Sequence, residues 1–561
     1  MDAKEFKSIL IDLGQRKITD DEVRTILSEH DSNADGVLSW SEFVDMMSKI
    51  KGTDDSKFGS VSVDKSGKAV ATTEGEHGGK HTYSIEERGT FARLINFSLA
   101  DDEDLADRLP MKDEDETLFH SFDNGVLLCK LMMKIDPNCI DARAINKGQQ
   151  MNVYQVKENI QMGIAAAKAL GIKLIGINSS DFINKVPHMI LTCIWQALRI
   201  LSAKLVNLQE TPELFRLCNE GETIDDLKKL SPEAILIRWV NFHLEKAGQE
   251  RRIKNLGKDL ADSEALFYVL NQLGADKCPL DGHDDADHIK RAEKMILNST
   301  ALGVPEIVKP ADICNGNVKV NTLFVAQIFN TKHGLEELTE EEYKAAGLDD
   351  DDVEGTKEER TFRLWINSLN LEDVMVNNLF TDFNDGILLC KIIHKINPSA
   401  VNWKLVDMAP DNDFKKNINN NAGVDACKKG LGLKMIGIGG VDLTKGHKKT
   451  ILACVWQLVR LHYLQLIGNK SEDDLSKWGN ELVGDKAPAI KNLKDKSMGS
   501  GVYLMHLLSA IEPRAVNWDI MTAGESDEDK EMNCKYVISV ARKLGAVIFG
   551  VWEDIVNVNS K

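Results

Sequence analysis

Oxygen-bearing side chains recur at alternate positions in one short segment near the N-terminus, residues 31–42, DSNADGVLSWSE. Carboxylate or amide oxygens occupy positions 1, 3 and 5, and the glycine at position 6 permits the sharp turn of a calcium-binding loop. Position 7 offers its backbone carbonyl, position 9 a direct or water-mediated oxygen, and the glutamate at position 12 both carboxylate oxygens. The predicted calcium ligands are Asp31, Asn33, Asp35, Val37, Ser39 and Glu42.

Two helices must hold such a loop in place, and the sequence predicts them over residues 21–30 and 42–50. This helix–loop–helix pattern makes residues 1–52 an EF-hand region with one complete calcium loop. A purely structural loop that binds no ion is the alternative interpretation. Ca²⁺ is the single cofactor that the sequence predicts.

Patterns that would support catalysis are weak. The segment GIGG at 437–440 follows no strand, so it predicts a tight turn rather than a phosphate loop. The run HDDADH at 283–288 has metal-binding residue types, but its acids are better suited to cap the helix that begins near Ile289. No nucleophile and base combination is visible. The sequence therefore predicts no catalytic residue, and the protein is not expected to be an enzyme.

The composition is typical of a largely helical protein with several domains. Of the 561 residues, 43% are hydrophobic and 28% are charged, and only 12 are proline. Acidic residues outnumber basic ones 88 to 69, and the net charge of -19 argues against nucleic-acid binding. No apolar run reaches the ~18–20 residues of a membrane span, and no signal peptide is visible. We expect a cytoplasmic protein.

Internal repeats decide the architecture. The segment FDNGVLLCK at 122–130 returns as FNDGILLCK at 383–391, an offset of 261 residues. The same offset relates Asp181 to Asp442, and the pattern predicts one ungapped register from Phe122 to Arg199. A weaker pair, RWVN at 238–241 and KWGN at 477–480, interleaves with the first. The order is therefore A-B-A′-B′, a duplicated tandem pair of helical units.

A known family matches these units. They resemble calponin-homology domains, and four of them behind an EF-hand resemble the fimbrin and plastin family. The most specific stretches are HTYSIEE at 81–87, LSPE at 230–233, RWVNFHL at 238–244 and GIGGVD at 437–442. The resemblance implies an all-α fold in which an N-terminal EF-hand precedes four calponin-homology helical domains arranged as two tandem pairs.

The boundaries follow from the repeats and from two segments of different composition, a Gly/Ser/Thr-rich one and an acidic one. We predict an EF-hand region at 1–52, a flexible linker at 53–82, domains at 83–205 and 210–334, an acidic linker at 335–358, and domains at 359–468 and 471–561. The fourth domain is expected to lack its closing helix, because only VNVNSK follows Asp554-Ile555. The N-terminal region likewise lacks the first of the two calcium loops that the family usually carries.

The resemblance also implies an activity. Family members cross-link actin filaments into tight bundles and use one actin-binding domain per tandem pair. Two copies of one binding unit on a single chain can hold two filaments, and a monomer would suffice. We therefore expect a calcium-regulated actin-bundling protein of the actin cytoskeleton. The alternative is a calcium-sensing scaffold whose calponin-homology pairs bind another polymer or signalling proteins.

The family's actin-facing segments include the last helix of each leading domain. Actin is acidic, so basic residues on or beside these helices are the candidate contacts. KGHKK at 445–449 is the densest basic cluster, with a solvated turn as its alternative interpretation. Trp195 and Trp456 on the same helices are expected in the core rather than in contact with actin. The candidates are Lys185, His188, Arg199 and Lys204 in the first pair, and Lys445, His447, Lys448, Lys449 and Arg460 in the second.

Overall fold

The structure is a computed structural model that describes residues 60–63, 69–74, 80–148, 150–345, 353–372, 374–468 and 470–559. The chain divides into two units, Met1–Ile85 and Glu86–Lys561. The predicted calcium loop, from Asp31 to Glu42, lies outside the described residues.

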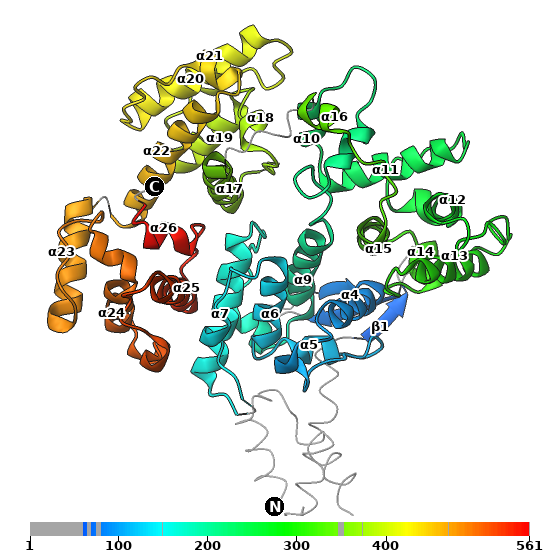
Figure 1. Ribbon diagram of the computed structural model, residues 1–561, viewed down its shortest axis with the longest axis horizontal. Coiled ribbons are helices and arrows are strands. Elements are labelled where there is room, and N and C mark those ends of the chain that lie inside the picture. The colour runs from blue at the N-terminus through cyan, green and yellow to red at the C-terminus, as the bar shows by residue number, and fades with distance from the viewer. Residues whose placement is uncertain are drawn as a thin grey trace, which may run out of the picture. The chain divides into compact units, whose positions relative to one another are not determined.

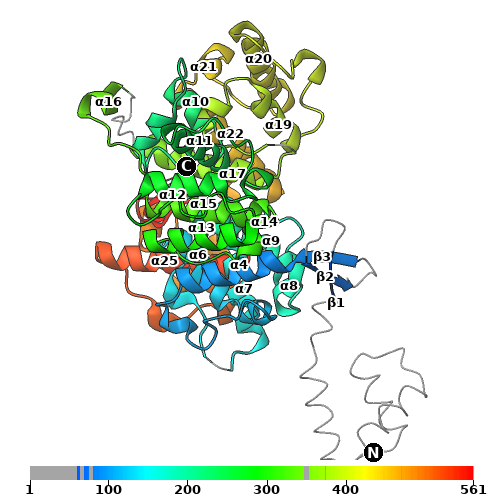
Figure 2. The ribbon, with the colours of Figure 1, turned by 90° about the vertical axis from the view of Figure 1, so that its right-hand side faces the viewer.

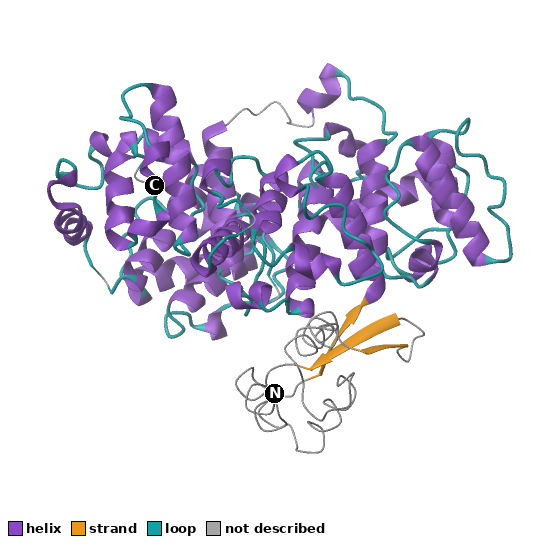
Figure 3. Ribbon diagram, turned by 90° about the horizontal axis from the view of Figure 1, so that it is seen from below, coloured by secondary structure: helices purple, strands orange, loops and turns teal. Residues whose placement is uncertain are grey.

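The first unit contains a small antiparallel sheet where the sequence predicts a flexible linker. Its three strands are β1 (Ser60–Val63), β2 (Ala69–Glu74) and β3 (Lys80–Ser84), in the order β1-β2-β3. Figure 3 shows the strands in orange. Ala71 of β2 lies opposite Val61 on one side and Tyr83 on the other. The linker prediction is therefore corrected over these residues. The valines and threonines of β1 and β2 favour strands, although the apolar content of these segments is too low to suggest a core.

The second unit is helical among its described residues and follows the predicted order of four domains (Figure 1). The first domain contains α4 (Ile85–Ser98), η2 (Glu103–Leu105), α5 (Thr117–Ser121), α6 (Val126–Ile135), η3 (Ala142–Ala144), α7 (Val153–Ala169), α8 (Ser179–Ile183) and α9 (Pro187–Ser202). The second contains η4 (Pro212–Leu217), α10 (Ile224–Lys228), α11 (Pro232–Lys246), η5 (Lys258–Leu260), α12 (Glu264–Leu273), α13 (His288–Leu302), α14 (Pro310–Cys314) and α15 (Val318–Thr331).

The third and fourth domains repeat this pattern after a connecting helix, α16 (Glu340–Ala345). The third contains α17 (Val353–Ser368), α18 (Leu379–Asp382), α19 (Ile387–Ile396), η6 (Trp403–Leu405), α20 (Asp413–Gly430), α21 (Gly440–Thr444) and α22 (Lys448–Leu466). The fourth contains α23 (Glu472–Val483), η7 (Gly484–Lys486), η8 (Lys496–Ser500), α24 (Val502–Ile511), η9 (Pro513–Ala515), η10 (Trp518–Ile520), α25 (Asp527–Lys543) and α26 (Trp552–Val556).

The repeated apolar segments form the central helices of the first and third domains. Almost every side chain of α6 is buried, and half of those of α19 are buried as well. Each of these helices begins after a glycine with a positive φ, +78° at Gly125 and +74° at Gly386. A Cβ at Gly125 would lie 2.6 Å from the backbone nitrogen of Ile160, so glycine is required there by both conformation and space.

The ungapped register predicted from Phe122 to Arg199 is wrong within one helix. Asn159 of α7 and Asn419 of α20 make the same bonds, although they are 260 rather than 261 positions apart. Each side chain accepts from, and donates to, the backbone of the loop before its helix, at Asn146 and Asp407 respectively. The second copy has one residue fewer in that loop. Its helix has one residue more, which restores the register.

The repeated aspartates make the same short turn in the first, second and fourth domains. Asp181, Asp312 and Asp554 each accept a hydrogen bond from the backbone N–H three residues earlier, at the start of α8, α14 and α26. Such a bond satisfies a free amide at the start of a helix. The start of α11 is capped as well, because Ser231 accepts from the Ala234 N–H and proline follows at the first helical position.

The acidic linker is shorter than predicted. Residues 340–345 form α16, and α17 of the third domain already begins at Val353. Seven residues, 346–352, separate these two helices.

The central helix of the fourth domain is less covered than its counterpart in the third. Tyr503, Met505 and Ser509 are the buried side chains of α24, whereas Ile511 is exposed. The third domain instead buries a continuous core in which Leu389 and Ile393 of α19 are fully covered.

Stability of the second domain is expected to fall in mild acid because of His243. Its Nε2 donates to the His333 carbonyl at 2.9 Å, while Nδ1 is buried without a partner among the described residues. Burial lowers the pKa of His243 to about 4, and Lys246 adds to the effect. An unfolded histidine titrates near 6.5, so the unfolded chain binds the proton first as the pH falls. Between pH 7 and pH 5 we expect a loss of about 2 kcal/mol.

Hydrogen exchange of α11 and α15 peptides at both pH values, corrected for intrinsic rates, measures this loss. A His243→Leu variant provides the control, because it cannot titrate and should lose much less protection. Equal corrected protection of the wild-type peptides at pH 7 and pH 5 would contradict the assignment.

Candidate functional site

The densest basic cluster occupies the turn between α21 and α22 of the third domain. Lys445 follows α21, His447 precedes α22, and Lys448 and Lys449 form the first turn of α22. All four side chains are exposed. Within the cluster, His447 Nδ1 lies 3.7 Å from Asp442, and Lys448 lies 5.9 Å above the ring of Phe380. The structure therefore brings four of the five second-pair candidates together on one surface.

The equivalent turn of the first domain carries Lys185 and His188. Both side chains are half-buried, and Lys185 lies 3.6 Å from Asp123. Lys185 has a φ of 56° in a turn whose counterparts in the second and third domains are Gly316 and Gly446, with φ values of 60° and 70°. A left-handed conformation is costly for lysine and free for glycine. Strain of this kind is more common at functional sites than elsewhere.

Two of the predicted contacts, Arg199 and Arg460, join the domains within each pair. Arg199 of α9 binds both carboxylate oxygens of Glu233, in the first turn of α11. Arg460 of α22 binds Glu472, in the first turn of α23, at 2.8 Å. Both pairs of domains therefore have the same bridge from the last helix of the leading domain to the opening helix of the trailing one. Sequence alone did not reveal it, because each partner belongs to a different repeat.

The two domains of the first pair are also joined by a more buried residue that the sequence analysis missed. Arg93 of α4 donates to Asp312 at 2.9 Å and to the Ile307 carbonyl at 2.8 Å, and it pairs with Asp113 of its own domain. Helix α15 packs against α9 in the same interface, where Asn330 donates to the Ser202 carbonyl. Burial raises the pKa of Asp312, and Arg93 and Lys309 oppose that rise.

The remaining first-pair candidate, Lys204, is exposed just beyond α9. It lines a pocket of about 260 Å³ whose opposite wall comes from the third domain, including Arg363 and Leu364. Nearby, Lys173 donates to the Val374 carbonyl at 2.7 Å, and burial lowers the pKa of Lys173. The four first-pair candidates are therefore split between the two ends of α9, and the C-terminal end faces the third domain.

The first and fourth domains are also in contact, and this contact contains buried basic groups. Helix α7 packs against α25, and Arg542 and Lys543 at the end of α25 are buried there. Arg542 donates to the carbonyls of Cys139 and Ile548, while Lys543 lies 3.6 Å from Glu158. Burial lowers the pKa of both basic groups. The repeat pattern gave no indication of this interface, because α7 and α25 belong to different unit types.

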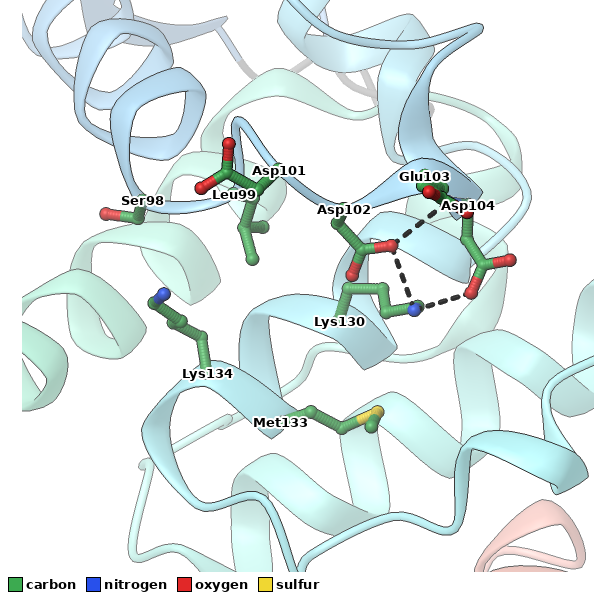
Figure 4. A pocket seen from close by; sticks show the side chains of 9 residues that line it. All are labelled: Ser98, Leu99, Asp101, Asp102, Glu103, Asp104, Lys130, Met133 and Lys134. Atoms are coloured by element: carbon green, nitrogen blue, oxygen red, sulfur yellow. Dashed lines mark hydrogen bonds and ion pairs between the residues drawn. The ribbon is translucent and has the colours of Figure 1, made fainter.

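A hollow of about 500 Å³ in the first domain is lined by acidic residues, and its geometry is that of an ion-pair network (Figure 4). Lys130 of α6 points between Asp102 and Asp104 and lies 3.0 and 2.6 Å from them. The hydrogen bond from Lys130, with one from Lys147, lowers the pKa of Asp104. Among the described residues, no group of three or more His, Cys, Asp or Glu side chains is placed to hold a metal ion.

The tryptophans on the two last helices are half-buried. Trp195 stacks against Phe91 at 6.2 Å, and Lys319 of the second domain lies 5.8 Å above its ring. Trp456 packs against the core of the third domain. Both side chains therefore pack within the protein. In the part of the chain that the structure describes, no helix is both long and apolar enough to cross a membrane.

The calponin homology (CH) domain family matches four segments of the chain, residues 86–202, 230–334, 356–463 and 469–561. An EF-hand domain pair family matches residues 1–50. The first match of each tandem pair contains the basic turn before its last helix. The predicted fold class, an EF-hand followed by four CH domains, is confirmed.

Relatives are similar in sequence over nearly the whole chain. Fimbrin-5 of Arabidopsis thaliana is 35% identical over 555 residues, which are 97% of this chain and 80% of that protein. Human Plastin-1 is 36% identical over 565 residues, 96% of this chain and 88% of the relative. A crystal structure of the actin-crosslinking core of Schizosaccharomyces pombe fimbrin matches with a TM-score of 0.73 and 33% identity, over 85% of this chain and 97% of that one. The chain therefore belongs to the fimbrin and plastin family.

Proposed function

We propose that this protein cross-links actin filaments into bundles, with one actin-binding domain in each tandem pair of CH domains. The observation that carries the proposal is the duplicated pair itself, in which Arg199–Glu233 and Arg460–Glu472 make the same bridge twice. Two equivalent binding units on one chain can hold two filaments at once. The similarity to a fimbrin core described as actin-crosslinking supports actin as the polymer. The protein then acts by binding rather than by catalysis, in the actin cytoskeleton of the cytoplasm.

Electron microscopy of actin filaments mixed with the full chain tests the function. Parallel arrays of filaments are the expected result. Single, decorated filaments would mean that the chain binds actin without cross-linking it, and bare filaments would favour the scaffold alternative, in which the CH pairs bind another polymer or signalling proteins.

Lys185 provides a test of where the first pair contacts actin. A Lys185→Gly variant relieves the left-handed conformation and should stabilise the first domain by about 1 kcal/mol. The same change removes a positive charge from the proposed contact with acidic actin, so filament affinity should fall. Stability and affinity therefore move in opposite directions, which unfolding of the variant cannot mimic. Both are measured on a fragment of residues 83–334, and unchanged affinity would remove Lys185 from the contact.

Calcium is proposed to regulate bundling through the EF-hand region. The donor set of Asp31, Asn33, Asp35, Val37, Ser39 and Glu42 consists of the oxygens that Ca²⁺ prefers. The match to an EF-hand family over residues 1–50 supports this assignment. Regulation would follow if calcium changes how this region contacts the segment that leads to the first CH domain.

A Glu42→Gln variant is expected to weaken calcium binding sharply, because it removes a charge from the bidentate ligand. The wild-type site should lie in the ~10⁻⁷–10⁻⁵ M range of sensor proteins. Titration calorimetry of the full chain measures the calcium affinity of the wild-type protein and of the variant. No calcium-dependent heat from the wild-type protein would mean that the loop does not bind calcium.

A further inference from the structure

The chain that leaves the second CH domain folds back onto it before reaching the third. After α15 ends at Thr331, the His333 carbonyl accepts hydrogen bonds from Trp239 Nε1 at 2.7 Å and from His243 Nε2 at 2.9 Å. Leu335 is buried immediately afterwards. The first residues of the connection between the two pairs are thus fixed to α11.

A second attachment point lies at Arg216 of η4. Its guanidinium donates to both carboxylate oxygens of Glu342, at 2.7 and 2.8 Å, and to the carbonyl of Glu337 at 3.0 Å. A weaker bond reaches the Glu336 carbonyl at 3.4 Å. Isolated surface ion pairs contribute little, but a bidentate pair with additional carbonyl bonds is geometrically specific. Figures 1 and 2 place α16 near α10, which follows η4 in the chain.

Glu342 also organises the helix that it attaches. Its carboxylate accepts from the Thr339 N–H and hydroxyl, and the Glu342 N–H donates to the Thr339 hydroxyl, which is a reciprocal cap at the start of α16. The bonds from Arg216 and Thr339 lower the pKa of Glu342 to about 2. One carboxylate therefore both forms α16 and holds it against the second CH domain.

The attachment shortens the connection between the two pairs. With residues up to Ala345 held, the chain from there to Val353 can span at most about 30 Å, whatever the conformation of residues 346–352. Without the Arg216 contacts, the last fixed points are the buried Leu335 and the exposed Glu336, which pairs with Lys246 at 3.1 Å, and the same calculation gives about 60 Å. The first domain also contacts the third and fourth domains directly. Once those contacts are broken, the greatest separation that the connection allows depends on whether Arg216 holds Glu342.

We propose that Arg216 and Glu342 form a clamp that halves the reach of the connection between the two tandem pairs. The consequence for filaments rests on the proposed function: when the direct contacts between the pairs open, the clamp limits how far the two actin-binding domains can part and so narrows the spacing between bundled filaments. Effective concentration at the second site falls as a connection lengthens beyond the span it must cover.

Hydrogen exchange of the free, full-length protein tests the clamp without actin. In an Arg216→Ala variant, amides of residues 336–345 should exchange about tenfold faster, because several charge-assisted bonds are lost. Peptides from α11 and α15 should be unchanged. The matched control is Arg252→Ala, which removes an exposed arginine that pairs with Glu245 of the same domain. Unchanged exchange of 336–345 in Arg216→Ala would overturn the clamp, as would equally faster exchange throughout the second domain.

Electron micrographs of bundles test the consequence for filaments. Arg216→Ala should widen the mean distance between filaments and broaden its distribution, while Arg252→Ala should leave both unchanged. Faster exchange with unaltered spacing would show that the clamp exists but does not set the spacing, which overturns that half of the proposal. Absence of bundles with the wild-type chain would instead contradict the proposed function and leave the exchange result as it stands.

Discussion

A fragment of residues 83–334 is expected to bind actin filaments and to leave them unbundled. It contains one tandem pair, joined by Arg93, by Arg199–Glu233 and by the packing of α15 on α9. One actin-binding domain can hold one filament, and cross-linking needs two on the same molecule. The fragment should therefore pellet with filaments at high speed and should fail to pellet them at low speed.

The matching fragment of the second pair, residues 353–561, is the natural control and should behave in the same way. Both must be tested at concentrations where they are monomeric, because a dimer of one pair would regain two binding domains. If a monomeric fragment with one tandem pair pelleted filaments at low speed, cross-linking would not require two binding domains on one chain, and the argument from bivalency would be wrong.

Replacing Arg93 with alanine is expected to destabilise the first pair by about 3–5 kcal/mol. The substitution leaves the carboxylate of Asp312, whose side chain is 8% exposed, without its charged partner from the first domain. An unpaired buried charge is among the most costly single changes a protein can suffer. The loss should shrink at low pH, because a protonated Asp312 no longer carries the charge.

Denaturant unfolding of the 83–334 fragment measures this loss, and actin affinity should fall with it as the two domains lose their fixed orientation. Lys309→Ala is a matched control, since Lys309 approaches Asp113 from a half-exposed position and should cost less than about 1 kcal/mol. A cost for Arg93→Ala no greater than that of Lys309→Ala would show that the interface does not depend on this ion pair.

The four-domain architecture could be predicted from the sequence because its signals are local and repeated. Gly125 and Gly386 mark the same turn, and the apolar helices that follow them contribute buried side chains to their domains. The register was mispredicted in α20 because the loop before it is one residue shorter than in the first domain and the helix is one residue longer. The two changes compensate, so the offset of 261 residues is the same before the loop and after the helix. Only the side-chain bonds of Asn159 and Asn419 reveal the shift.

The short sheet was missed for a different reason. Strands β1 and β2 place valine or threonine among serine and alanine, and such a segment has too little apolar content to be recognised as part of a packed element. Strand pairing depends on the neighbouring strands as well as on local propensity. The linker prediction therefore failed where tertiary contacts decide the structure.

The candidate site could be predicted only in part. The basic residues around Lys448 are adjacent in the sequence, so their clustering on the surface follows directly. The roles of Arg199 and Arg460 depend on acids in the next domain, and that of Arg216 on an acid 126 positions away. The repeat pattern shows which residues are equivalent, but it does not show which residues from different repeats come into contact.

Sedimentation of actin filaments with the full chain, at low speed and at high speed, tests the central claim most directly. If one chain holds two filaments, the filaments and the protein should pellet together at low speed, where single filaments stay in solution. Protein that pellets with actin only at high speed would mean binding without cross-linking. No pelleting of the protein with actin at any speed would contradict the account and favour a scaffold that binds another partner.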